Sequence, residues 1–261
     1  MRRDWPMIPP AMTLRLLTAA AAALVFASCA GSGSGSGPSI SSGSGNNLSH
    51  DQWGHRPGPK GFSTVIIDAG HGGKDSGAVH NGLREKDLAL DTAKRLQRQL
   101  GGKVRTVLMR SSDEFIDLDV RAARASGKDG TILVSIHYNS SGSAVRGPET
   151  YYWRVDSHGL ATRIQRNVAS VSPAESGNRG MVRRRLRLTR NPDVPCVLVE
   201  IGYLSNASEA KLCGDPAYRD RMAAAVAHAI LDQQANGDAG TGPLPKPIFA
   251  PPSRPTDAPG S

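Results

Sequence analysis

The sequence predicts an α/β protein: a single three-layer α/β/α domain whose mixed, mostly parallel sheet has about six strands. Two observations support this. Short β-branched or apolar runs alternate along the chain with longer segments whose apolar residues recur at helical spacing, which is typical of a sheet covered by helices on both faces. These segments occupy residues 61–235, a stretch of about 175 residues that is long enough for one well-buried domain.

The first half of the domain contributes three strands and two helices. The first strand, 64–67, is the run Thr-Val-Ile-Ile, which breaks at Asp68-Ala69-Gly70 as a buried strand does where a loop begins. A helix at 85–100 stops before Gly101-Gly102. A strand at 103–110 and a helix at 117–126 follow. The third strand, 131–137, is apolar for most of its length, as expected for a strand buried on both faces.

The second half follows the same alternation. We expect a strand at 149–154, a helix at 159–171, strands at 186–189 and 196–200, and a closing amphipathic helix at 218–234. Glycine and polar residues separate these segments. The strand count of about six comes from these assignments.

The start of the chain has the features of an export signal. Residues 12–15 form a short positive region and residues 16–27 an apolar stretch of about 12 residues, which is too short to span a bilayer. The stretch ends in Val-Phe-Ala-Ser-Cys, which resembles the lipobox of bacterial lipoproteins, although leucine is usual where Phe26 stands. We therefore expect residues 1–28 to be a lipoprotein signal peptide and Cys29 to carry a lipid. Ala30 follows Cys29, which permits delivery to the outer membrane, with the protein on the periplasmic side of the cell envelope.

Low-complexity segments flank the predicted domain. Residues 29–60 are mostly Gly, Ser and Asn near their start and are expected to form a flexible tether. Residues 236–261 are rich in Pro, Gly, Ala and Asp and are expected to be a disordered tail. Cys196 and Cys213 are the remaining thiols, and we expect two separate, buried side chains and not a disulfide framework.

The formal net charge is +9. A basic protein is attracted to polyanions, which include nucleic acid, anionic lipid and the acidic polymers of a cell wall. Because the leader directs the chain out of the cytoplasm, the sequence favours the cell wall and argues against nucleic acid.

Four residues have side chains suited to metal binding or acid–base chemistry at positions where a site can form. His71 closely follows the first expected strand, His137 ends the third and Glu200 ends the last. Carboxyl ends of parallel strands meet at one edge of a sheet, so these side chains are expected to converge. Glu85 stands at the start of a helix, where an acid also complements the helix dipole. Each residue alone has an ordinary structural interpretation.

Four segments in order along the chain resemble the zinc-dependent N-acetylmuramoyl-L-alanine amidases that act in cell separation and sporulation. They read IDAGHGGKDSGA at 67–78, EKDL at 85–88, SIHYN at 135–139 and VEIGYLSN at 199–206. The resemblance extends over nearly the whole predicted domain. It implies an enzyme that hydrolyses the amide bond between N-acetylmuramic acid and the L-alanine of the peptidoglycan stem peptide.

The resemblance also implies the roles of the four residues: His71, Glu85 and His137 would bind Zn²⁺, and Glu200 would be the catalytic glutamate. The chemistry agrees, because two neutral imidazoles and one carboxylate leave a zinc site with a net charge of about +1, which preserves its strength as a Lewis acid. A free glutamate can then accept a proton from water and pass it to the leaving amine.

Two other functions remain open from the sequence. A zinc peptidase that acts within the stem peptide could use the same site, because that site can hydrolyse any amide. A non-catalytic wall-binding module is the second alternative, although it would not need all four residues.

We expect a monomer whose substrate is peptidoglycan and whose membrane contact is the lipid on Cys29. The sequence does not identify an activator protein. The run Arg183–Arg187 is either a solvated loop or a contact for stem-peptide carboxylates.

Overall fold

The computed structural model describes residues 58–190 and 192–245, all of which belong to one unit of the chain, Ser44–Ser261. The predicted signal peptide, Cys29 and most of the predicted tether lie outside the described residues. Among the described residues, no helix is both long enough and apolar enough to cross a membrane.

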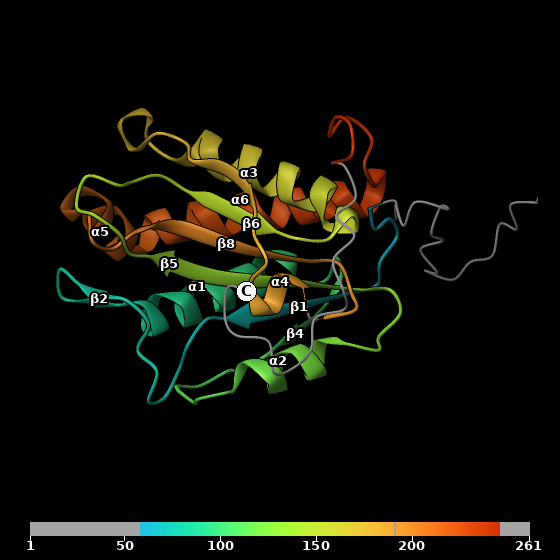
Figure 1. The fold of residues 1–261 in the computed structure, drawn as a ribbon, viewed down its shortest axis with the longest axis horizontal. Helices are drawn as coiled ribbons and strands as arrows, with labels where there is room; N and C mark the ends of the chain where they lie inside the picture. Colours follow the sequence, from blue (N-terminus) through green and yellow to red (C-terminus); the bar gives the residue numbers. More distant parts are fainter. Residues whose placement is uncertain (1–57, 191, 246–261) are drawn as a thin grey trace, which may run out of the picture. The chain divides into compact units, whose positions relative to one another are not determined.

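Six strands form the central sheet, in the order β4-β1-β5-β8-β6-β7 (Figure 1). They are β1 (Thr64–Ala69), β4 (Arg105–Leu108), β5 (Thr131–Asn139), β6 (Glu149–Tyr152), β7 (Gly180–Arg183) and β8 (Cys196–Tyr203). Within this sheet, β6 and β8 are the one antiparallel pair, and the other four pairs are parallel. The mixed, mostly parallel sheet of six strands is therefore confirmed.

One predicted strand is wrong, and another segment takes its place in the sheet. Residues 186–189 form no strand; α4 (Arg187–Arg190) lies there, and the sixth strand is β7. The Thr189 hydroxyl donates to the backbone oxygens of Arg184 and Leu186, and the Thr189 amide donates to the same Leu186 oxygen. Such local bonds compete with strand pairing for the backbone.

The predicted helices are confirmed to within two residues at each end. They are α1 (Glu85–Leu100), α2 (Leu118–Ala125), α3 (His158–Val171) and α6 (Pro216–Asn236). The hairpin β2 (Val79–His80) and β3 (Leu83–Arg84), the helix α5 (Ala207–Gly214) and two 3₁₀ turns, Val155–Ser157 and Ala174–Ser176, were not predicted. The free thiols of Cys196 and Cys213 are buried, as expected.

The described chain continues beyond the predicted domain at its carboxyl end. Asn236 ends α6, and the backbone oxygens of Gly237 and Ala239 accept hydrogen bonds from the Arg163 guanidinium. The Asp238 carboxylate accepts a bond from the Gly58 amide. Residues 246–261 of the predicted tail lie outside the described part.

The two faces of the sheet are covered unequally. The larger apolar core combines one set of alternate strand residues with α1, α3 and α6, and a smaller core combines the other set with α2 and α4. Ile66, Leu133 and Cys196 belong to the smaller core. Because strand side chains alternate between faces, His137 and Glu200 project on this thinly covered side.

Two buried arginines hold the loop that follows β1. Arg110 donates to the backbone oxygens of Ala69, 2.9 Å, and Gly70, 2.8 Å. Arg121 of α2 donates to the Ala69 oxygen, 2.8 Å, and the His71 oxygen, 2.6 Å, and forms a 2.5 Å ion pair with Asp68. Ser135 donates to the second Asp68 oxygen at 2.6 Å. The ion pair is almost fully buried, with the Arg121 side chain 2% exposed and that of Asp68 0%.

Replacement of Asp68 by alanine is expected to lower the free energy of unfolding by about 3–5 kcal/mol, because it leaves the charge of Arg121 buried without its counter-ion. Asp87→Ala is the control: it removes the exposed Arg84–Asp87 pair and should cost less than about 1 kcal/mol. Urea unfolding monitored by circular dichroism measures both. Similar small losses in the two variants would contradict the structural role assigned to Asp68.

Candidate metal centre and active site

His71 lies in a tight loop that has no space for a side chain at Gly70 or Gly77. Its own backbone is left-handed, with φ 58°, and Arg121 holds its carbonyl oxygen. A Cβ on Gly70 would lie 2.4 Å from the His137 ring, and a Cβ on Gly77 would lie 2.5 Å from a Glu85 carboxylate oxygen. Any larger residue at either position would therefore collide with the site.

Glu85 is the first residue of α1, and its carboxylate is almost fully buried, with 6% of the side chain exposed. One oxygen, Oε2, accepts a hydrogen bond from the Ala78 amide at 2.8 Å. The other, Oε1, accepts one from the Tyr138 amide at 3.1 Å. Two backbone donors thus fix the orientation of the carboxylate.

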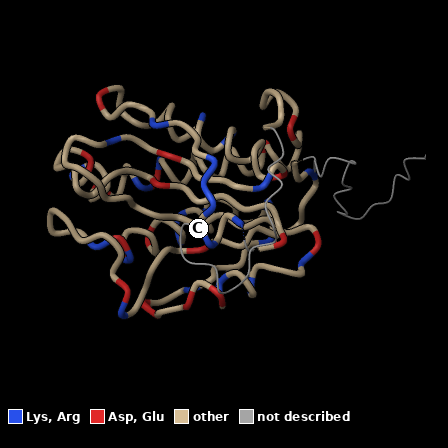
Figure 2. The backbone as a smooth tube through the Cα atoms, in the orientation of Figure 1, with Lys and Arg blue, Asp and Glu red and all other residues tan. Residues whose placement is uncertain are grey.

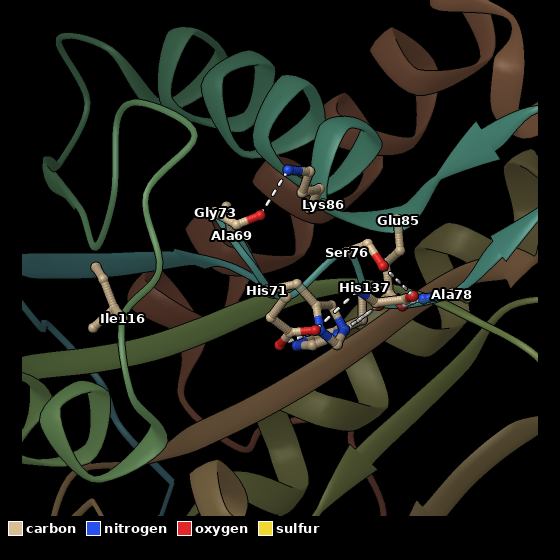
Figure 3. A network of polar contacts seen from close by, with 12 residues as sticks. Ala69, His71, Gly73, Ser76, Ala78, Glu85, Lys86, Ile116 and His137 are labelled. Atoms are coloured by element: carbon tan, nitrogen blue, oxygen red, sulfur yellow. Dashed lines mark hydrogen bonds and ion pairs between the residues drawn. The ribbon is translucent and has the colours of Figure 1, made fainter.

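The side chains of His71, Glu85 and His137 converge on one point (Figure 3). Glu85 Oε1 lies 3.0 Å from His71 Nε2 and 2.8 Å from His137 Nδ1. The two imidazole rings meet edge to face, with centroids 5.0 Å apart. One donor atom from each residue lies within 4.8 Å of the other two. Two ring nitrogens and one carboxylate oxygen at this spacing can bind a single divalent metal ion.

Asp75 orients the first of these histidines. Its Oδ2 atom lies 2.8 Å from His71 Nδ1, and its Oδ1 atom accepts a bond from the Gly77 amide. A carboxylate on one ring nitrogen directs the other nitrogen toward the metal and makes it more basic. Asp75 lies within the segment at 67–78, but its contact with His71 was not predicted from the sequence.

Contact between Glu85 and His71 shifts the pKa of both residues. Burial by itself would raise the pKa of Glu85, but its hydrogen bonds with His137 and His71 outweigh that effect and hold the pKa well below its usual range. Burial lowers the pKa of His71, and contacts with Glu85 and Asp75 outweigh it, so the pKa is raised. The carboxylate therefore remains ionised, as a metal ligand must.

Glu200 lies beside His137 on the same face of the sheet. The two residues are register partners in the parallel β5–β8 pair, and Glu149 is the register partner of Glu200 in the antiparallel β6–β8 pair. Glu200 Oε2 is buried and has no hydrogen-bond partner within residues 58–190 and 192–245. Burial first, and then the charges of Glu85 and Glu149, raise the pKa of Glu200 well above its ordinary value. A carboxyl group of this kind is suited to take up and return a proton.

Glu149 and its neighbours were not anticipated from the sequence. The Glu149 carboxylate accepts hydrogen bonds from the hydroxyls of Tyr151, 2.8 Å, and Tyr203, 2.6 Å. The Asn139 amide donates to both hydroxyls at 3.2 Å. Burial and Glu149 raise the pKa of Tyr151 to about 12. This network ties β5, β6 and β8 together immediately beside His137 and Glu200.

A cavity of about 400 Å³ opens beside the metal-binding group. Its polar lining residues are Asp68, His71, Asp75, Asp117, Arg121, His137 and Arg187. Its apolar wall consists of Phe115, Ile116, Leu118, Leu186, Leu188 and Leu198. This wall comes from the α2 and α4 regions and from β8, so no single stretch of sequence indicated it.

The structure thus brings together His71, Glu85, His137 and Glu200, the four residues that the sequence singled out. Cys29, the predicted lipidation site, lies outside the described residues.

Comparison with known proteins points to one family. Residues 65–232 match the family model described as N-acetylmuramoyl-L-alanine amidase (Amidase_3). The chain is 38% identical over 172 residues to the uncharacterized protein YqiI of Bacillus subtilis, covering 64% of this chain and 82% of that protein. It is 35% identical over 170 residues to the N-acetylmuramoyl-L-alanine amidase LytC of B. subtilis, covering 62% of this chain and 34% of LytC.

A solved structure has a similar fold. The catalytic domain of CwlV, an N-acetylmuramoyl-L-alanine amidase from Bacillus (Paenibacillus) polymyxa, superposes with a TM-score of 0.60 at 37% identity. The superposition covers 65% of this chain and 97% of that domain.

Asp75→Asn is expected to weaken metal binding about tenfold or more, because it removes the carboxylate that orients His71. Titration with Co²⁺, monitored by visible absorption, measures the dissociation constant. Asp87→Asn, a change at an exposed acid of the same type on α1, should leave it unaltered. Equal affinities in the wild-type protein and Asp75→Asn would show that Asp75 does not support the metal ligand.

Proposed function

The chain belongs to the N-acetylmuramoyl-L-alanine amidase family, and we propose that it is a zinc-dependent enzyme that hydrolyses the amide bond between N-acetylmuramic acid and L-alanine in peptidoglycan. The observation that carries the proposal is the convergence of His71, Glu85 and His137 beside the buried Glu200.

The donor set fits zinc. Two imidazole nitrogens and one carboxylate oxygen are a common set of protein ligands in catalytic zinc sites, which keep a fourth position open. Zinc bound there supplies Lewis acidity, which polarises the scissile carbonyl and makes water a better nucleophile at neutral pH. The backbone donors to Glu85 and the carboxylate of Asp75 keep two of the three ligands in place.

Glu200 supplies the proton transfers. As water attacks the carbonyl carbon, a C–O bond forms and Glu200 accepts a proton from that water. When the C–N bond breaks, the same proton passes to the nitrogen of L-alanine, which leaves as a neutral amine. The raised pKa of Glu200 suits this exchange, because it makes the carboxylate a stronger proton acceptor.

Glu200→Ala is expected to retain zinc and to lose activity by about 100-fold or more, because the general base is absent. His137→Ala should lose both zinc and activity. The measurement is mass spectrometry of the products that each variant releases from purified sacculi, together with metal analysis. The expected wild-type products carry a free lactyl group on muramic acid and a free amine on L-alanine, and a chelator should abolish them.

Two outcomes would refute parts of this proposal. Cleavage between residues of the stem peptide would identify a peptidase instead. Normal turnover by Glu200→Ala would remove the assignment of the general base.

The site of action is also proposed, from the leader sequence alone. The apolar stretch that ends at Cys29 supports export followed by lipid attachment, which places the enzyme at the periplasmic face of the outer membrane within reach of peptidoglycan. Cys29→Ser is expected to shift the protein from the membrane fraction to the soluble periplasmic fraction. Unchanged membrane association on immunoblots of fractionated cells would contradict lipidation at this residue.

A further inference from the structure

The basic run between β7 and α4 contains arginines in different environments. Figure 2 shows it as a nearly continuous blue stretch of backbone. Arg183 donates to the Trp153 backbone oxygen at 2.8 Å and lies over the Trp153 ring. Arg187 forms an ion pair with Asp119 of α2. These two side chains therefore have structural partners.

Arg184 is different, because hydrogen bonds hold its backbone while its guanidinium is exposed to solvent. The Arg184 amide donates to the Tyr152 oxygen at 2.8 Å, and the Arg184 oxygen accepts a bond from the Thr189 hydroxyl. The side chain is exposed, and its guanidinium lies 5.7 Å from the centre of the Tyr151 ring. Within residues 58–190 and 192–245 it forms no ion pair and no side-chain hydrogen bond. A planar guanidinium supported by an aromatic ring is well arranged to bind a carboxylate through two parallel hydrogen bonds.

The guanidinium is close to the candidate active site. Tyr151 is the register partner of Leu198, two residues before Glu200 on β8, so both side chains project on the same face as Glu200. The Tyr151 hydroxyl reaches Glu149, the cross-strand neighbour of Glu200. The charge of Arg184 also acts on Glu200, where it opposes the rise in pKa caused by burial.

The two arginines that line the cavity already have carboxylate partners. Arg121 and Arg187 line the apolar cavity on the α2 side, but they are paired with Asp68 and Asp119 respectively. A substrate carboxylate would have to displace one of these aspartates in the cavity. On the β6 side, a substrate carboxylate could bind the Arg184 guanidinium without displacing an aspartate.

Peptidoglycan provides a free carboxylate close to the cleaved bond. In the stem peptide, L-alanine is followed by D-glutamate joined through its γ-carboxyl group, so the α-carboxylate of that residue is free. It lies within about two residue lengths of the cleaved bond, roughly 7 Å. We propose that Arg184 binds this α-carboxylate and makes the enzyme selective for stem peptides in which it is not amidated. This inference rests on the proposed amidase function.

The test uses two synthetic N-acetylmuramoyl tripeptides that differ only in the second residue, γ-linked D-glutamate in one and its α-carboxamide in the other. The wild-type protein should hydrolyse the carboxylate substrate with a KM about tenfold lower than that of the amide, as expected for one hydrogen-bonded contact between charged groups. In Arg184→Gln the KM for the carboxylate substrate should rise to that of the amide, with kcat little changed. Arg184→Lys should recover part of the preference.

Arg221→Gln is the matched control, because Arg221 is also exposed and its guanidinium also lies 5.7 Å from a tyrosine ring, that of Tyr218 on α6. This variant should behave like the wild-type protein. Equal KM values for the two substrates in the wild-type protein would overturn the inference, as would a loss of kcat in Arg184→Gln that is the same for both. Failure of the wild-type protein to release L-alanine peptides from either substrate would overturn the proposed function itself.

Discussion

The buried ion pair between Arg121 and Asp68 is the interaction on which the site depends. It joins α2 to the end of β1, and the same guanidinium holds the backbone oxygens of Ala69 and His71. A buried ion pair is a poor source of net stability, since desolvation offsets much of its attraction. Its contribution here is geometric. His71 lies in a glycine-rich loop that would otherwise sample many conformations, and the ion pair holds the His71 backbone in its left-handed conformation. The His71 side chain therefore contacts Glu85 and lies beside His137.

Strand register determines the rest of the site. His137, Glu200 and Glu149 are neighbours on three adjacent strands, so their side chains form a row on one face. A shift of one residue in any of these strands would move its side chain to the opposite face. The hydrogen bonds from Asn139 and the two tyrosines around Glu149 fix that register beside a β-bulge in the β5–β8 pair. Because α2 and α4 are short, this face stays open to a substrate.

The site combines several acidic groups. Glu85 is kept ionised by two imidazoles, whereas Glu200, between Glu85 and Glu149, is driven toward its protonated form. The pKa values of these two carboxyl groups are thus shifted in opposite directions, because their surroundings differ. Arg184 adds one exposed positive charge at the edge of this acidic group, where a substrate carboxylate can lie without adding to the repulsion.

Sequence alone determined what local patterns encode: the α/β class, the limits of α1, α2, α3 and α6 within two residues, and the choice of His71, Glu85, His137 and Glu200 as candidate site residues. These are readable because helical periodicity and motif spacing are local properties of a chain. Tertiary structure decided what depends on pairing between distant segments. It placed the sixth strand at Gly180–Arg183 and made residues 187–190 a helix, set Glu149 opposite Glu200, and assembled the apolar cavity from separate elements. It also placed the exposed guanidinium of Arg184 against the Tyr151 ring, beside the site. These features depend on strand register and on packing between distant segments, so the sequence of one segment cannot specify them.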